Sequence, residues 1–137
     1  MPLSALLTCL VVGISDGDTL TARCEDQTVK IRLAEIDAPE KAQPFGNRSK
    51  QHLSDLCFDV KAEVHPQTTD RYGRTVAHVS CDGVDASAEQ VRSGMAWVYD
   101  KYVRDKSLYT LQDEAVAARE GLWSARDPVP PWKWRRR

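Results

Sequence analysis

The chain has 137 residues, 42% of them hydrophobic and 28% charged, which is enough for one globular domain with its own core. No apolar run reaches the roughly 18 residues that a transmembrane helix needs, so we predict no membrane partner. The net charge is −1, and without the three arginines at 135–137 there remain 16 basic residues against 20 acidic ones. An acidic body argues against non-specific coating of nucleic acid, so any nucleic acid must be held by a local basic site.

The two ends of the chain differ from its body. The first twelve residues are apolar but have no basic residue at their start, so they do not form a complete signal peptide. We interpret residues 1–5 as the remnant of a removed leader. At the other end, Pro128, Pro130 and Pro131 are expected to end regular structure, and Trp132 and Trp134 to anchor a tail over residues 128–137. We predict a single domain over residues 1–137.

The first two strands are expected over residues 6–14 and 19–24. The first is rich in Leu, Val and Ile, and the second follows Asp16-Gly17, a dipeptide typical of hairpin turns. With these two residues as the turn, Cys9 lies opposite Cys24, at a spacing that suits a disulfide.

Three further strands follow. Apolar and polar residues alternate over residues 29–33 and 60–64, which predicts strands with one buried face and puts Arg32 on the other face. A helix is expected over residues 44–56 and a fifth strand over 75–81. If the fourth and fifth strands are antiparallel, Cys57 lies near Cys81.

The four cysteines therefore suit two disulfides, Cys9–Cys24 and Cys57–Cys81, in an oxidising compartment. None belongs to a Cys-x-x-Cys pair, which disfavours a zinc site. The alternative is four buried free thiols in a cytosolic protein.

Two more helices are predicted in the second half of the chain. A capping box at residues 87–90 begins a helix that Gly94 ends, and Ser107 caps a longer helix that runs to Gly121. Five short strands with these helices predict an α+β fold, mainly a small five-stranded barrel decorated by helices.

Three short motifs carry the chemistry. They are Asp16-Gly17-Asp18-Thr19, a longer motif over residues 31–40, and Asp70-Arg71-Tyr72-Gly73-Arg74. Each by itself has an ordinary interpretation as a hairpin turn, a strand end fixed by proline, or a solvated turn. Together they combine carboxylates, which suit Ca²⁺ or Mg²⁺, with arginines, which suit phosphate. This combination is suited to cutting a phosphodiester bond.

The order of these motifs resembles the staphylococcal nuclease (thermonuclease) family. The likeness covers about residues 11–134 and includes Ala96-Trp97-Val98-Tyr99 and Gly121-Leu122-Trp123-Ser124. The resemblance implies an OB-fold barrel with three helices, and a secreted or periplasmic, monomeric Ca²⁺-dependent nuclease that acts on DNA and RNA. It implies cleavage of the P–O5′ bond, which leaves 3′-phosphate ends, with little sequence specificity and no protein partner.

The resemblance also assigns site residues by motif. It implies Ca²⁺ ligands at Asp18, Asp37 and the backbone carbonyl of Ala38, where the family's prototype has threonine. It places Glu40 on the attacking water and makes Arg32 and Arg74 catalytic arginines that clamp phosphate.

Substrate contacts are expected from a basic and aromatic set. Arg71, Tyr72 and Arg74 lie around Gly73 in a pattern suited to phosphate or nucleotide. The resemblance places Tyr72 near phosphate and Tyr99 near the base. Trp97 stands where the prototype has tyrosine, and no stacking role is assigned to it.

Other residues and other functions were weighed against this interpretation. Glu35 is assigned no catalytic role, and His52, His65 and His78 are interpreted as surface or structural residues because none belongs to a triad motif. A barrel that binds nucleic acid or protein without cutting is one alternative. A small structural or inhibitor-like disulfide protein is another, but it leaves the site residues unexplained.

Overall fold

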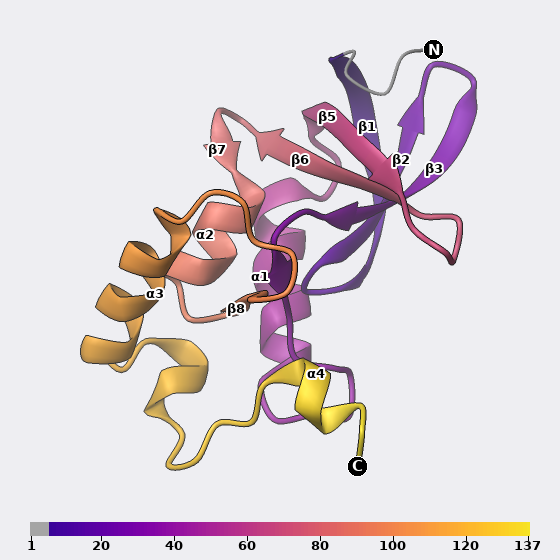
Figure 1. Cartoon of the computed structure of the whole chain (residues 1–137). Helices are drawn as coiled ribbons and strands as arrows, with labels where there is room; N and C mark the ends of the chain where they lie inside the picture. Colours follow the sequence, from indigo (N-terminus) through magenta and orange to yellow (C-terminus); the bar gives the residue numbers. More distant parts are fainter. Residues whose placement is uncertain (1–5) are drawn as a thin grey trace.

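The computed structural model describes residues 6–137, so the interpretation of residues 1–5 as a leader remnant lies outside the described residues. Figure 1 shows a strand-rich half formed early in the chain and a helical half formed mostly later. The five main strands are β1 (Leu7–Asp16), β2 (Thr19–Cys24), β3 (Gln27–Leu33), β5 (Lys61–Thr69) and β6 (Thr75–Cys81). Three two-residue strands, absent from the predictions, are β4 (Ile36–Asp37), β7 (Val84–Asp85) and β8 (Trp97–Val98).

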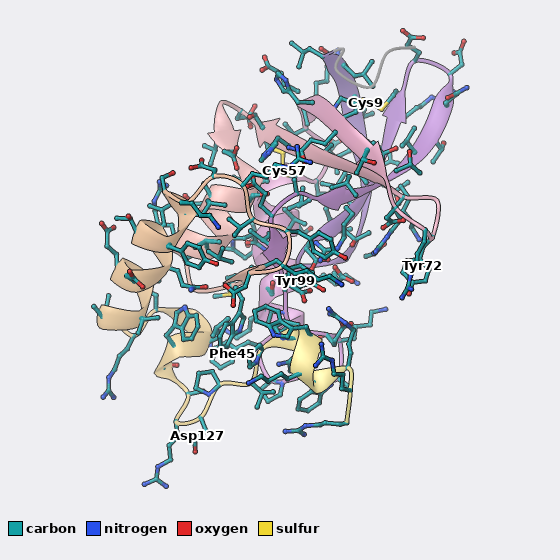
Figure 2. The ribbon with its side chains drawn as sticks, in the orientation of Figure 1. Cys9, Phe45, Cys57, Tyr72, Tyr99 and Asp127 are labelled. Atoms are coloured by element: carbon teal, nitrogen blue, oxygen red, sulfur yellow. A yellow bond between two sulfur atoms is a disulfide. The ribbon has the colours of Figure 1, made fainter. Side chains whose placement is uncertain are left out.

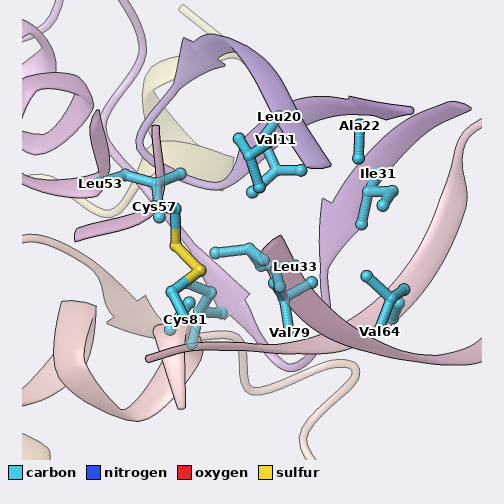
Figure 3. Packing of buried hydrophobic residues seen from close by; sticks show 14 of the residues in the cluster. Val11, Leu20, Ala22, Ile31, Leu33, Leu53, Cys57, Val64, Val79 and Cys81 are labelled. Carbon is cyan, nitrogen blue, oxygen red and sulfur yellow. A yellow bond between two sulfur atoms is a disulfide. The ribbon is translucent and has the colours of Figure 1, made fainter. Parts of the chain in front are cut away.

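The main strands close into a barrel. The sheet order is β3-β2-β1-β5-β6-β7, and parallel pairing of β3 with β6 closes the five main strands into a ring. The alternating residues of each strand send their apolar side chains inward, where they meet in a single core. Figure 3 shows this core, which includes Val11, Leu20, Ile31, Leu33 and Val79. The predicted α+β fold built on a five-stranded OB-type barrel is confirmed.

The β1–β2 hairpin differs from the prediction in its turn. Asp16 pairs with Thr19, so Gly17 and Asp18 form the turn instead of Asp16 and Gly17. Two irregularities in β1, between Val11 and Gly13 and between Ile14 and Asp16, absorb the difference. Extra residues at such bulges shift the register by one step each. The predicted pairing is therefore correct at the far end of the hairpin and wrong at the turn.

Both predicted disulfides are present. Cys9 faces Cys24 across the hairpin and is bonded to it, and Cys57, at the end of α1, is bonded to Cys81, at the end of β6. Figure 3 shows the second disulfide inside the core. It ties the helix to the barrel.

The helices are α1 (Gly46–Cys57), α2 (Ala86–Arg92), α3 (Leu108–Ala117), the 3₁₀ helix η1 (Gly121–Ser124) and α4 (Pro131–Trp134). No helix within residues 6–137 is long and apolar enough to cross a membrane. The resemblance implied three helices, and α1–α3 supply them, while η1 and α4 are short additions.

Two predictions about helix ends are wrong. The side chain that caps α2 belongs to Asp85, which accepts a hydrogen bond from the Ala88 backbone N–H, while Ser87 lies inside the helix and donates to the Ala34 carbonyl. The helix expected after Ser107 does begin there, with Ser107 at the N-cap position, but it ends at Ala117 instead of Gly121. The Ser107 side chain makes no cap bond, and its hydroxyl donates to Asp105.

The prolines of the tail do not end regular structure, contrary to the prediction, whereas Trp132 does anchor the tail, stacked on Tyr99 and edge-on to Trp97. Pro131 occupies the first turn of α4, where a missing N–H costs nothing. The tail returns beside the loop over residues 38–46, as the yellow segment of Figure 1 shows, and the Gln43 side chain donates a hydrogen bond to the Val129 carbonyl.

Candidate active site

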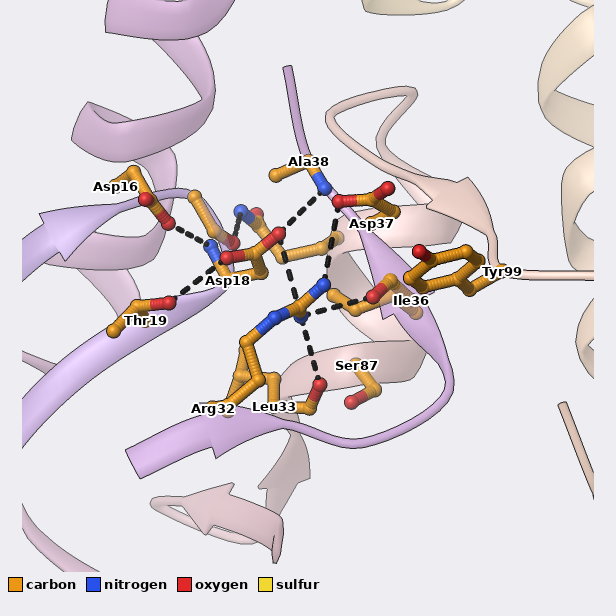
Figure 4. A network of polar contacts seen from close by, with 12 residues as sticks. Asp16, Asp18, Thr19, Arg32, Leu33, Ile36, Asp37, Ala38, Ser87 and Tyr99 are labelled. Carbon is orange, nitrogen blue, oxygen red and sulfur yellow. Dashed lines mark hydrogen bonds and ion pairs between the residues drawn. The ribbon is translucent and has the colours of Figure 1, made fainter. Parts of the chain in front are cut away.

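Asp18 lies in the β1–β2 turn, where its carboxylate is buried and fully engaged. Its Oδ1 accepts a hydrogen bond from the Thr19 hydroxyl at 3.0 Å, and its Oδ2 accepts one from the Ala38 backbone N–H at 2.7 Å. The Asp18 backbone N–H donates to Asp16 Oδ1 at 3.0 Å. Figure 4 shows these contacts drawing the turn toward the segment after β4.

Helices α1 and α2 hold the β1–β2 turn in place. Gln90 of α2 is completely buried and its amide donates to the Gly17 carbonyl at 2.7 Å and to the Ser49 carbonyl at 3.1 Å. A Cβ added at Gly17 would lie 1.8 Å from Ser49 Oγ, so only glycine fits between the turn and α1. The position of the Asp18 carboxylate is therefore set by the packing of α1 and α2.

Arg32 projects from β3 on the face opposite the core and links both acidic motifs. It forms ion pairs with Asp18 at 3.3 Å and with Asp37 at 3.2 Å. Its Nη1 also donates to the carbonyls of Leu33 and Ile36, at 3.1 Å and 2.9 Å. Backbone acceptors fix the plane of the guanidinium, which is visible at the centre of Figure 4.

Asp37 is held at the site by β4, whose pairing with β8 sets Asp37 opposite Trp97. The Asp37 side chain is about as buried as the core, with a relative exposure of 1%. Ala38, the next residue, donates its N–H to Asp18, so the two acidic motifs meet at this point.

Burial and mutual repulsion set the protonation of the carboxylates. Burial, with the nearby Asp18 charge, raises the pKa of Asp16 to about 7. Burial also raises the pKa of Asp37 to about 6, against the bonds it accepts from Arg135 and the charge of Arg32. For Asp18, burial opposes ionisation, but the Arg32 charge and hydrogen bonds from Asp16, Ala38 and Thr19 outweigh it and lower the pKa. The site concentrates negative charge that Arg32 only partly offsets.

Glu40 lies at the outer edge of the site, where it meets a residue from the other end of the chain. Arg135 pairs with Glu40 at 2.6 Å and with Asp37 at 2.7 Å. Its guanidinium also lies 3.4 Å from the Tyr99 hydroxyl. Hydrogen bonds to Asp37 and Glu40 raise the pKa of Arg135 further above its usual range. Glu40 and Tyr99, both predicted site residues, are thus brought to the same cluster.

The third motif stands apart from this cluster. Arg74 is bound by Asp70, whose Oδ2 accepts from Nε at 2.8 Å, and Arg71 donates to the Tyr72 hydroxyl at 2.8 Å. Tyr72 is 68% exposed and lies at the tip of the β5–β6 loop, away from Tyr99 in Figure 2. Within residues 6–137, no ion pair joins Arg74 to Asp18, Asp37 or Glu40. The loop leads into β6, which pairs with β3 so that Val76 lies opposite Arg32. The loop is therefore joined to the strand that lies beside Arg32.

The donors at the site suit a hard cation that retains water. In the part of the chain that the structure describes, no group of three or more His, Cys, Asp or Glu side chains could hold a metal ion. Two buried carboxylates and a backbone carbonyl, from Asp18, Asp37 and Ala38, are nevertheless all oxygen donors. Ca²⁺ and Mg²⁺ take such ligands and complete their shells with water. The buried excess of negative charge favours a cation at this place.

Comparison with known proteins identifies the family of this chain. The family model described as staphylococcal nuclease homologue matches residues 30–125. The chain belongs to the staphylococcal nuclease family. It is 45% identical over 130 residues to an uncharacterized endonuclease of Haemophilus influenzae, and the match covers 94% of this chain and 73% of that protein. It is also 42% identical over 137 residues to a micrococcal nuclease of Shigella flexneri, and that match covers 92% of this chain and 79% of that protein.

In this staphylococcal nuclease family member, two charged residues of the site were missed by sequence reasoning. Asp16 was interpreted only as a turn residue, although its place two residues before Asp18 is a signal for a second carboxylate. Arg135 was assigned no role in the site, and no local pattern marks it, because only the path of the tail brings it to Asp37.

Glu35 was assigned no catalytic role. It supports the site of this family member by fixing the loop that carries Tyr99. Its carboxylate pairs with His78 at 2.9 Å and accepts the backbone N–H groups of Arg104 and Asp105. Its own carbonyl accepts from the Tyr99 N–H at 2.9 Å. Glu35 thus anchors the loop that carries Tyr99, and His78 is structural in this arrangement.

Proposed function

We propose that the chain is a Ca²⁺-dependent nuclease that hydrolyses DNA and RNA at the P–O5′ bond, leaving 3′-phosphate ends with little sequence specificity. Family membership supports a nuclease, a hydrolase of phosphodiester bonds. The observation that carries the proposal is the convergence of Asp18 and Asp37 on either side of Arg32. Carboxylates for a cation and an arginine for phosphate are thereby combined in one place.

The cation would be held by Asp18, Asp37 and the Ala38 carbonyl. When bound, Ca²⁺ supplies positive charge that offsets the diester's charge in the ground state and the transition state. Arg32 uses three of its five N–H donors on Leu33, Ile36 and Asp37, which leaves two for a phosphate oxygen. A guanidinium already fixed by backbone carbonyls needs little reorganisation when charge develops on that oxygen.

Glu40 is the residue that we propose acts on the attacking water. Its carboxylate is 37% exposed, at the edge of the buried cluster, so solvent reaches it. Its backbone N–H is fixed by the Gln43 side chain at 3.0 Å. In the proposed reaction Glu40 orients the attacking water and takes its proton.

The β5–β6 loop would bind substrate from the side. Arg71 and Arg74 both lie over the Tyr72 ring, at 5.0 Å and 5.5 Å, and present two cations beside an exposed aromatic face. In the proposed reaction Arg74 contacts the scissile phosphate, and Arg71 and Tyr72 contact the neighbouring phosphates. Contacts of this kind do not depend on base sequence.

The two disulfides suggest an extracytoplasmic protein. We propose a secreted or periplasmic location and action as a monomer without a protein partner. Degradation of free nucleic acid is a suitable task for such a protein.

The proposal is tested by incubating the oxidised protein with labelled single-stranded DNA and RNA, first with Ca²⁺ and then with excess EGTA. We expect cleavage only with Ca²⁺, and products that a 3′-phosphatase modifies. Glu40→Gln should lower the rate at least about 10²-fold, whereas Glu63→Gln, on an exposed position of β5, should not change it. Calcium-independent cleavage, no cleavage, or near-normal turnover of Glu40→Gln would contradict the proposal.

A further inference from the structure

Arg135 occupies two carboxylates of the candidate active site at once. Its Nη2 lies 2.7 Å from Asp37 Oδ2, and its Nη1 lies 3.1 Å from Asp37 Oδ1 and 2.6 Å from Glu40 Oε1. The first two contacts form the parallel, bidentate arrangement that makes arginine–carboxylate pairs strong and specific. Arg135 therefore binds the site as an ion pair and not as a chance neighbour.

A divalent cation and Arg135 compete for the same oxygens. Asp37 Oδ1 already accepts hydrogen bonds from Arg32 and Arg135, and Oδ2 accepts one from Arg135. Asp37 is almost fully buried, so its carboxylate has little room to turn toward a second partner. A cation bound to Asp37 would also repel a guanidinium less than 3 Å from the same oxygen.

Arg135 is delivered to this place by packing of the tail. The Trp132 ring is stacked on Tyr99, with centroids 5.3 Å apart and planes 5° apart, and it meets Trp97 edge-on at 5.7 Å. The backbone N–H of Arg135 donates to the Pro131 carbonyl, which keeps Arg135 in the same turn as Trp132. The segment over residues 131–135, which we call the C-terminal strap, thus has an aromatic anchor and an ionic anchor.

The strap also covers the ring expected to meet the nucleobase. One face of Tyr99 is taken by Trp132, and Tyr102 meets the ring edge-on at 4.9 Å. The strap also borders a cleft, so it is not packed on all sides. That cleft is lined by residues of the 39–45 loop and of the tail, among them Pro39, Phe45, Val129 and Trp134.

We propose that Arg135 is an intramolecular counter-cation, which holds the C-terminal strap closed over the active site until a divalent cation displaces it from Asp37 and Glu40. The inference rests on the proposed function, because it assigns Asp37 to the cation. A four-residue helix is not stable by itself, so after loss of the ionic anchor only the aromatic anchor of Trp132 holds the strap, which then opens more often and exposes Tyr99. Cation binding is thereby coupled to exposure of the Tyr99 ring, which is expected to contact the nucleobase.

The test compares two variants that remove the same charge from the same tail. Arg135→Gln removes the competitor, whereas Arg136→Gln removes an exposed neighbour that makes no ion pair within residues 6–137. Isothermal titration of each protein with CaCl₂ measures the affinity of the cation. We expect Arg135→Gln to bind Ca²⁺ at least about fivefold more tightly than Arg136→Gln, a typical coupling between competing sites.

Hydrogen–deuterium exchange of the wild-type protein gives a second measurement that does not depend on activity. In the closed strap, the N–H groups of Lys133, Trp134 and Arg135 donate to Pro130 and Pro131. We expect these amides to exchange at least about fivefold faster in saturating Ca²⁺ than in EGTA, because the strap opens. Unchanged or slower exchange overturns the inference.

The outcomes separate the inference from the proposed function. If the wild type cleaves with Ca²⁺ and the two variants bind Ca²⁺ equally, or Arg135→Gln binds it more weakly, the inference is wrong and the nuclease assignment stands. If none of the three proteins binds Ca²⁺ or cleaves, both are wrong.

Discussion

Asp18 Oδ2 accepts a hydrogen bond from the backbone N–H of Ala38 at 2.7 Å. This bond joins the β1–β2 turn to the segment after β4, two pieces of chain that are 20 residues apart. It brings the two carboxylates of the proposed cation site together. A site assembled in this way depends on the shape of the turn as much as on the acidic residues.

The shape of the turn is tested by Gly17→Ala. Its Cβ would lie 1.8 Å from Ser49 Oγ and 2.9 Å from Ala38 Cβ, so the turn must shift away from α1. We expect a loss of about 1–3 kcal/mol in the free energy of unfolding and a large loss of nuclease activity. Gly13→Ala is the control, because its Cβ would meet only Thr21 Cβ at 3.8 Å. Equal urea midpoints for the two variants would contradict this account.

Arg32→Ala should impair catalysis. The change removes the ion pairs to Asp18 and Asp37 and the proposed donor to phosphate. We expect the cleavage rate at saturating Ca²⁺ to fall at least about 10²-fold, as when one transition-state contact is lost. Arg23→Ala, on an exposed position of β2, should retain the wild-type rate. Turnover near normal in Arg32→Ala would refute the role of Arg32.

The Asp70–Arg74 pair makes a pH-dependent contribution to stability. Burial alone would raise the pKa of Asp70, but hydrogen bonds from Arg74 and from the Tyr72 backbone outweigh it and lower the pKa below its usual 3.8. A lowered pKa means that stability is present above pH 3.8 and is lost as pH falls. Asp70→Asn should therefore be less stable by about 0.5–1 kcal/mol at pH 7, since the pair is partly exposed.

That difference should shrink as the pH falls below 3.8, because the Asp70 carboxylate then takes up a proton first in the unfolded chain and, at lower pH, in the folded protein. Urea unfolding of both proteins at several pH values measures it. A difference that is constant with pH would show that the charge of Asp70 is not responsible.

Reduction of the disulfides should destabilise the protein strongly. The bonds close loops with sequence separations of 15 and 24 residues, and each such bond typically contributes about 2–4 kcal/mol. We expect the urea midpoint to fall in dithiothreitol. Peptide mapping without reductant should recover Cys9 linked to Cys24 and Cys57 linked to Cys81. Other pairings, or an unchanged midpoint, would contradict the structure.

Much of the barrel was predictable because its signals are local. Alternation marks β3 and β5, and it places Arg32 opposite the core side chains of Ile31 and Leu33. Pairing in the first hairpin predicted one disulfide, and the antiparallel fourth and fifth strands predicted the other. The turn was misplaced because bulges change the register without a sequence signal that alternation can detect.

Local signals also failed where a side chain had a better partner farther away. Ser87 has the pattern of a capping residue, yet its hydroxyl donates to Ala34 at 2.8 Å, while Asp85 caps the helix. Both residues suit an N-cap, and the position of β7 against the barrel decided between them.

The sequence by itself determined which residues are available for the chemistry: the acidic motifs, the arginine on β3 and the family to which they belong. The tertiary structure decided which of them meet. Asp18 and Asp37 meet around Arg32 because the hairpin turn packs on α1 and α2, whereas Arg74 stays with Asp70 on its own loop. Arg135 reaches Asp37 across 98 residues because Trp132 packs on Tyr99. Contacts over such separations depend on packing of the whole chain, and no local pattern encodes them.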